Sequence, residues 1–251
     1  MKATALGVPL ALLSLACAHA GPGPGAIQSE SLRVGAVSVE LHFSQDDAAA
    51  AEQVKRVLPR ALLAAERWGR LDEPVSVTIH PSHEGLEAAA LRPGQPWMRG
   101  WARRGSVDLQ SPRTWSRGRA SDDALGQILA HEFTHCVVFQ AAGRTWESEA
   151  IPGWFQEGIA TVTAGERHPR GGVRMRPVAG AAHPAGPDYD LADSAFRYLL
   201  ARYGEERVRS LLVRLGEGRG FPLAFRDALG VELMQFEAEL RAFLATPASP
   251  S

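Results

Sequence analysis

Two histidines four residues apart and a glutamate occur together in the segment His131-Glu132-Phe133-Thr134-His135. Residues at this spacing lie on one face of an α-helix, so both imidazoles can reach the same metal ion. Glu132 directly follows the first histidine and can take a proton from a water molecule at that metal. The segment therefore predicts metal-assisted hydrolysis with Glu132 as the general base.

A catalytic zinc site needs three protein ligands and one open position for water. Glu157 offers the third ligand because it lies on the next expected helix, and Gly158 beside it lets the two helices approach closely. Two imidazoles and one carboxylate leave the ion a single positive charge, which lowers the pKa of its bound water toward roughly 7. We therefore expect Zn²⁺ as the cofactor, held by His131, His135 and Glu157.

Two expected helices must position these side chains. The first covers residues 124–142, begins after the N-cap candidates Ser121, Asp122 and Asp123, and ends near Gly143. The second begins after Pro152 and runs to about residue 164. Because the connection between them is short, we expect the second helix to fold back against the first and bring the three ligands together.

The remaining pattern predicts an α+β fold, with a small mixed N-terminal sheet and its helices followed by a mainly helical part. Apolar residues recur with period two in the expected strands and with the helical period elsewhere. Pro59 is expected to kink or divide its helix. The expected strands cover 32–43 and 74–80, with a hairpin or edge strand at 100–110, and the expected helices cover 46–67, 82–91 and 191–244, the last broken at Gly204, 216–220 and Gly230.

We divide the folded chain into an N-terminal α/β part, residues 31–120, and a helical part with the metal site, residues 121–245. The chain has 251 residues, 45% of them hydrophobic, which is enough to bury a core of ordinary size. Its formal net charge of -1 excludes a whole-chain attraction to nucleic acid, so no nucleic-acid partner is expected. The sequence carries no signal for an oligomeric state.

The first twenty residues are expected to be an export signal. Lys2 precedes an apolar stretch, residues 3–16, which is long enough for a secretory signal and too short for a permanent membrane span. Two cleavage sites remain open, because residues 18–20 suit an ordinary signal peptidase and residues 15–17 resemble a lipoprotein signal with its lipid anchor on Cys17. The expected location is the periplasm or cell envelope, with or without that anchor, or the outside of the cell.

Residues 21–30 are expected to be a flexible spacer between the signal and the fold, and residues 246–251 a disordered tail. No later stretch is apolar for long enough to span a membrane. Because Cys17 is either removed or lipidated, Cys136 has no disulfide partner. Its apolar neighbours predict a small buried core residue.

The metal motifs resemble those of the gluzincin metallopeptidases, and more closely those of the peptidase MA-like domains of exported bacterial proteins. The resemblance rests on residues 130–135 and 152–160, with a weaker match from Tyr189 to Gly204. It implies a zincin-like fold, a peptide or protein substrate, and hydrolysis by zinc-activated water. It also implies that Tyr189 donates to the oxyanion during catalysis. The zinc ligands and the general base that it implies are His131, His135, Glu157 and Glu132.

The chain departs from this family at Thr161. Many of the related proteins have a carboxylate four residues after the third ligand, where it orients a zinc-binding histidine, but this chain has Thr161 in that place. A hydroxyl accepts the imidazole N–H without a charge, so we expect the histidine to be a less basic ligand.

Other hypotheses remain open beside the zinc metallopeptidase. A metal site without catalysis would belong to an envelope binding module that its metal stabilises, and a zinc amidase or esterase would use the same ligands. For Tyr189 the alternative is a packing role. His168 and His183 are interpreted as solvated loop residues, and His80 and His83 as surface residues. Three tryptophans either line a substrate groove or pack under a long loop: Trp97, Trp101 and Trp115.

Overall fold

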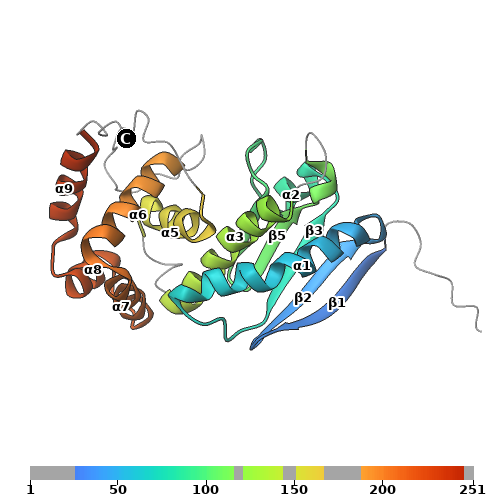
Figure 1. Ribbon diagram of the computed structural model, residues 1–251, viewed down its shortest axis with the longest axis horizontal. Coiled ribbons are helices and arrows are strands. Elements are labelled where there is room, and N and C mark those ends of the chain that lie inside the picture. The colour runs from blue at the N-terminus through green and yellow to red at the C-terminus, as the bar shows by residue number, and fades with distance from the viewer. Residues whose placement is uncertain (1–25, 116–120, 144–150, 167–187, 246–251) are drawn as a thin grey trace, which may run out of the picture.

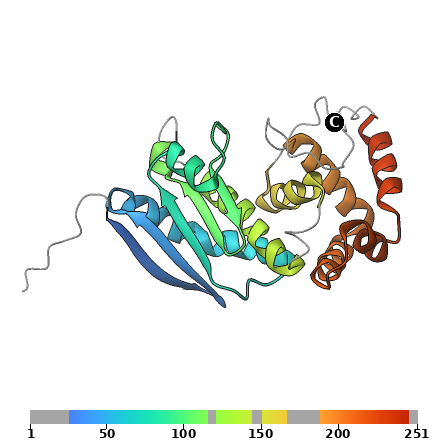
Figure 2. The same cartoon turned by 180° about the vertical axis from the view of Figure 1, so that it is seen from behind.

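The structure is a computed structural model that describes residues 26–115, 121–143, 151–166 and 188–245. In this part of the chain, one half of the molecule is a five-stranded sheet with helices on one face, and the other half is a cluster of helices (Figure 1 and Figure 2). The fold is therefore α+β, with a small mixed sheet and mostly helices, as the sequence predicts.

The sheet combines two hairpins with parallel pairing between them. Its strands are β1 (Ile27–Val34), β2 (Val37–Ser44), β3 (Val75–His80), β4 (Gly100–Arg103) and β5 (Ser106–Gln110). Their spatial order is β1-β2-β3-β5-β4, and β3 pairs in parallel with both β2 and β5. The hairpin expected over residues 100–110 is confirmed, and β4 forms one edge of the sheet.

The strand expected over residues 32–43 is a hairpin that turns at Gly35, where φ is +60°. Its first strand, β1, begins at Ile27, so the expectation of a spacer is wrong from residue 27 to residue 30. The side chains of β1 alternate between exposed and half-buried and include no buried one. A spacer and such an edge strand look alike in sequence, because β1 is held by backbone pairing with β2.

The helix α1 (Ala48–Ala65) runs without interruption through Pro59, so this proline does not divide the helix. A proline inside a helix costs about 3 kcal/mol, whereas burying one Val or Leu side chain contributes about 1.5–3 kcal/mol. Four such residues of α1 are buried on both sides of Pro59, which outweighs the lost hydrogen bond. They are Val54, Val57, Leu58 and Leu62.

The other helices follow the expected boundaries, since capping residues and glycines mark their ends. Ser121 accepts a hydrogen bond from the backbone N–H of Ala124 at the start of α3, and Gly143 follows its last residue. The breaks expected after residue 191 are confirmed. The helices are α2 (His83–Ala90), α3 (Asp122–Ala142), α5 (Gly153–Ala164), α6 (Tyr189–Tyr203), α7 (Glu205–Gly216), α8 (Phe221–Leu229) and α9 (Leu233–Ala245).

Three short 3₁₀ turns complete the described elements, at Gln45–Asp47, Glu66–Trp68 and Pro112–Thr114. The helix α3 contacts α1, β4 and β5 in one half of the molecule and α5 and α7 in the other. Because it is buried on most sides, Cys136 on this helix is a core residue, as predicted. None of the described helices combines the length and the hydropathy that crossing a bilayer requires.

His80 and His83 are not the surface residues that the sequence suggested. Nε2 of His80 lies 2.7 Å from Oδ1 of Asp108, and Nε2 of His83 lies 3.1 Å from Oε1 of Glu87. Both histidines are half-buried between α2 and the sheet. The expected export signal with Cys17, the tail at 246–251, and His168 and His183 lie outside the described residues.

Candidate metal centre

The helices α3 and α5 pack against each other and bring the three expected ligands together. Oε2 of Glu157 lies 3.4 Å from Nε2 of His131 and 3.8 Å from Nε2 of His135. Ligand atoms of all three residues lie within 4.8 Å of one another. Ligands about 2.1 Å from a tetrahedral ion are about 3.4 Å apart, so one divalent ion fits this donor set with small side-chain movements.

Gly158 allows the close packing that places Glu157, but against α6 and not against α3. A Cβ atom at residue 158 would lie 2.5 Å from the carbonyl oxygen of Ala192 and 2.6 Å from Cβ of Phe196. Real Cβ atoms do not approach other atoms so closely. The sequence therefore identified a close helix contact at Gly158 and assigned the wrong partner helix, because residue spacing does not show which neighbour a glycine faces.

Glu132 lies between α3 and the edge strand β4. A Cβ atom at residue 100 would lie 2.6 Å from Oε1 of Glu132, so only glycine leaves room for the carboxylate here. The backbone N–H of Ala102 donates a hydrogen bond to the same carboxylate. Burial raises the pKa of Glu132 to about 7, despite the opposing charge of His131. A carboxyl with this pKa can both accept and return a proton near neutral pH.

The first histidine is held from both sides by carboxylates. Nδ1 of His131 lies 3.1 Å from Oε1 of Glu166, while its Nε2 faces Glu157. Burial opposes protonation of His131, but hydrogen bonds with Glu157 and Glu166 raise its pKa well above the ordinary value. A metal ion would have to displace the proton on Nε2, and the Nδ1 hydrogen directed at Glu166 would then leave the Nε2 lone pair facing the metal.

Glu166 is the functional residue that the sequence analysis missed. It lies nine residues after Glu157, beyond the end of α5 at Gly165, where no helical spacing connects it with the ligands. Thr161, from which a weak hydrogen bond to histidine was expected, instead donates to the carbonyl oxygen of Glu157 on its own helix. The hydrogen-bond partner of His131 is therefore the carboxylate of Glu166 and not the hydroxyl of Thr161. The expectation of a less basic histidine ligand assumed the hydroxyl and is wrong.

Two hydrogen bonds of its own backbone hold Glu166 in place. Its backbone N–H donates to the carbonyl oxygen of Thr161 at 3.1 Å, and its own carbonyl oxygen accepts from Nη2 of Arg197 at 2.8 Å. Nε of Arg197 is in turn 2.8 Å and 3.0 Å from the two carboxylate oxygens of Asp193. Since Arg197 and Asp193 belong to α6, this helix helps to fix the carboxylate that contacts His131.

The other two ligand candidates are in the charge states that metal binding needs. Burial lowers the pKa of His135 to about 4, so its imidazole is neutral at neutral pH. Burial opposes ionisation of Glu157, but its hydrogen bond with His131 and the nearby His135 hold its pKa below the ordinary value. A neutral imidazole and an ionised carboxylate can bind a metal ion without first losing a proton.

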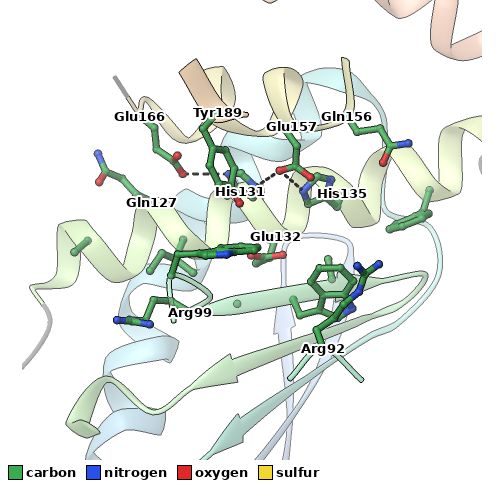
Figure 3. A pocket seen from close by; sticks show the side chains of 17 residues that line it. Arg92, Arg99, Gln127, His131, Glu132, His135, Gln156, Glu157, Glu166 and Tyr189 are labelled. Atoms are coloured by element: carbon green, nitrogen blue, oxygen red, sulfur yellow. Dashed lines mark hydrogen bonds and ion pairs between the residues drawn. The ribbon is translucent and has the colours of Figure 1, made fainter. Parts of the chain in front are cut away.

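Tyr189 is the first residue of α6 and lies beside His131, on the same side of the cleft as Glu157 and Glu166 (Figure 3). Its ring centroid lies 6.1 Å from that of His131 and 6.0 Å from that of Trp97. Burial raises the pKa of its phenol, and the charges of Glu157 and Glu132 raise it further. Tyr189 therefore keeps its proton and can act as a hydrogen-bond donor.

A cleft of ≈ 600 Å³ lies in front of these residues. Residues of α3 and α5 line one side, with Glu157 and the two histidines directed into it, and β4 with the loop before it lines the other (Figure 3). Trp97 and Trp101 line the cleft, whereas Trp115 packs against the main hydrophobic core. The structure thus places two of the tryptophans at a cleft and the third against the core, and a role of the first two in binding substrate stays a prediction.

The chain matches no family model, and no curated protein matches its sequence. Among solved structures, it is similar to an M1 zinc metallopeptidase from Deinococcus radiodurans, with a TM-score of 0.51 and 16% identity over 91% of this chain and 54% of that one. It is also similar to Legionella pneumophila aminopeptidase A in complex with aspartic acid, with a TM-score of 0.52 and 14% identity over 85% of this chain and 28% of that one.

The chain thus spans about half or less of the length of these structures. At such identities the likeness concerns the fold and not the activity. The protein has a zinc-metallopeptidase-like fold that resembles the M1 enzymes, with a group of two histidines and one glutamate that can bind a metal ion.

Proposed function

We propose that the protein is a zinc-dependent metallopeptidase that hydrolyses peptide bonds in peptides or proteins. The observation that carries the proposal is the convergence of His131, His135 and Glu157 within 4.8 Å at a cleft, beside a buried glutamate of raised pKa. The M1-like fold supports a peptidase over other uses of the same ligands. Zinc is the proposed metal because two imidazoles and one carboxylate are a typical catalytic zinc ligand set.

Each residue of the cleft has a proposed task. When bound, zinc supplies a Lewis acid that polarises a carbonyl group and makes water more acidic. Glu132, with a pKa of about 7, takes a proton from the attacking water and returns it to the leaving amine. Tyr189 donates a hydrogen bond to the carbonyl oxygen as negative charge develops there.

The edge strand β4 is the proposed bed for the substrate backbone. It pairs with β5 on one side, and on its other side Gly100 and Ala102 face Glu132. An extended peptide laid along this edge would pass directly in front of the general base. The same arrangement would bring the scissile carbonyl between Glu132 and Tyr189.

The experiment compares zinc content and peptidase activity in the purified wild type and three variants. Glu132→Gln should keep the zinc of the wild type and lose activity by about 100-fold or more, because it removes the proton carrier and no metal ligand. Glu157→Ala should lose both. Glu40→Gln, an exposed substitution on β2, serves as the control. Full activity of the Glu132→Gln protein on any peptide that the wild type cleaves would disprove the mechanism.

A hydroxamate separates the peptidase from a module that uses its metal only for stability. An open coordination position should bind the hydroxamate at the metal, and a closed structural site should not. A broad peptide digest then separates a peptidase from a zinc amidase or esterase, which would leave every peptide intact.

We further propose that the protein is exported, because a basic residue followed by an apolar stretch opens the sequence. Mass spectrometry of the mature N-terminus tests this proposal. A chain that begins after Ala20 indicates ordinary signal cleavage, and a lipid-modified Cys17 indicates an anchor. An intact leader in the mature protein would contradict both.

A further inference from the structure

We propose that the cleft selects substrates that carry a carboxylate near the cleaved bond, and that it does not anchor a free α-ammonium group. The inference rests on the proposed peptidase function and adds a substrate class to it. Its basis is the distribution of charged side chains around the cleft. Arg92 and Arg99 are the residues proposed to bind the substrate's carboxylate.

The described residues of the cleft include three acidic side chains, and each of them already has a role at the metal site. Glu157 faces both histidines, Glu166 contacts Nδ1 of His131, and Glu132 is buried against the backbone N–H of Ala102. A substrate's ammonium group would need a carboxylate of its own in the cleft. In the described part of the cleft lining, no carboxylate is left for that purpose.

Two guanidinium groups lie on the opposite wall. Figure 3 shows Arg92 and Arg99 on the β4 side of the cleft, across Glu132 from Glu157. Within the described chain, neither arginine pairs with a carboxylate, although most of the described arginines do. Their charges are therefore available to a substrate.

Trp101 restricts the orientation of the Arg92 guanidinium group. Its guanidinium carbon lies 5.0 Å from the ring centroid of Trp101, so one face of the group rests on the indole. The planar fork of N–H groups on a guanidinium matches the two oxygens of a carboxylate. The tryptophan thus restricts the arginine without neutralising it.

Arg99 is fixed by the backbone. Its Nη1 donates to the carbonyl oxygens of Pro96 and Met98, both at 2.9 Å. These two bonds hold the side chain without using its other nitrogens. Both arginines are therefore held by neutral groups, which keeps their full charge beside the cleft.

The local charge differs from that of the whole chain. The chain has a formal net charge of -1, but a divalent ion with two guanidinium groups outweighs three carboxylates when both histidines are neutral. A cleft with walls of low dielectric strengthens this local field. It attracts a carboxylate and repels an ammonium group, which would lie close to the metal and to both arginines.

The carboxylate has two sources in peptides, an acidic side chain and a free C-terminus. The test uses one quenched fluorescent peptide series with Glu, Gln or Lys beside the cleaved bond. Each peptide is made with a free or amidated C-terminus and with a free or acetylated N-terminus. We expect kcat/KM about tenfold higher for a carboxylate than for its neutral amide, as for one charge-assisted hydrogen bond, and no loss on acetylation.

The variants Arg92→Gln and Arg99→Gln should lower the ratio of kcat/KM between the carboxylate peptide and its neutral amide toward one. Arg33→Gln, on the exposed face of β1 at the far edge of the sheet, is the matched control and should preserve it. A preference that survives C-terminal amidation assigns the side chain as the source, and one that amidation abolishes assigns the terminus. Equal rates for Glu and Gln peptides together with equal rates for free and amidated C-termini would overturn the inference, and so would loss of cleavage on acetylation.

Binding separates a failure of this inference from a failure of the proposed function. Fluorescence anisotropy with the Glu132→Gln protein measures the Kd of the same labelled peptides without turnover. If the wild type cleaves no peptide, the proposed function fails, and the inference is decided by two Kd ratios alone, that of Glu to Gln peptides and that of free to amidated C-termini. If peptides are cleaved without charge preference, the proposed function stands and the inference fails.

Discussion

At the scale of single residues, the contact between Glu166 and His131 carries the clearest consequence. A carboxylate that accepts the Nδ1 hydrogen fixes the tautomer and the ring orientation of a metal-binding imidazole. We predict that Glu166→Gln lowers zinc affinity by about tenfold or more, because the amide keeps the shape and loses the charge. Competition with a chromophoric chelator measures this affinity. Glu217→Gln, on an exposed turn, is the control, and equal zinc affinity in both variants would contradict the role.

Gly100 has an equally local role beside Glu132. Because an added Cβ would lie 2.6 Å from Oε1 of Glu132, Gly100→Ala must displace the carboxylate from β4. We predict a fall in kcat of about tenfold to a hundredfold with unchanged zinc content, since a displacement of about 1 Å can cost that much. Gly153→Ala, where an added Cβ meets no atom within 4 Å, is the control. A normal kcat for Gly100→Ala would show that the base tolerates displacement.

At the scale of elements, the packing of α5 on α6 positions both the third ligand and Tyr189. Gly158 forms this contact, so Gly158→Ala forces the two helices apart at Ala192 and Phe196. We predict a loss of about 1–3 kcal/mol in the free energy of unfolding, which urea denaturation measures. Gly153→Ala on the same helix should show almost none of this loss. Similar stability of the two variants would mean that α6 adjusts without strain.

At the scale of the whole molecule, the metal group joins the half with the sheet to the helical half through α3 and α5. A ligand that binds only the folded state stabilises it by about 4 kcal/mol at 1,000 times its Kd. We therefore predict that chelation lowers Tm in the wild type and leaves Tm of Glu157→Ala nearly unchanged. Differential scanning calorimetry checks both. An equal fall in the two proteins would indicate that the chelator acts elsewhere.

The stability of the whole metal-free protein should also depend on pH, through the carboxyl group of Glu132. The pKa of Glu132 rises on folding from 4.5 to about 7, so ionisation destabilises the folded state progressively between these pH values. We predict that metal-free Glu132→Gln equals the wild type in stability near pH 4.5 and exceeds it by about 3 kcal/mol above pH 7. Urea denaturation at several pH values measures the difference. A difference that does not grow with pH would contradict the raised pKa.

The sequence alone determined the features that depend on neighbours along the chain. Caps, glycines and apolar periodicity indicated the helices around Glu132 and Glu157, and the residue types of that pair of helices predicted a metal group. These signals are local because a helix places residues by their spacing. Two local expectations fail for the same reason, a division of the helix at Pro59 and a spacer up to residue 30. Burial of α1 on the core and backbone pairing of β1 with β2 are not visible in the local sequence pattern.

Only the tertiary structure decided which distant residues meet at the cleft. It brought Glu166 to His131 from beyond the end of a helix, Gly100 to Glu132 across the sheet edge, and two arginines to the wall opposite the metal group. Such contacts join separate elements, and their geometry depends on how the helices pack on one another and on the sheet. Local spacing therefore predicts which side chains can bind a metal, while packing selects the groups that orient them and the charge that a substrate encounters.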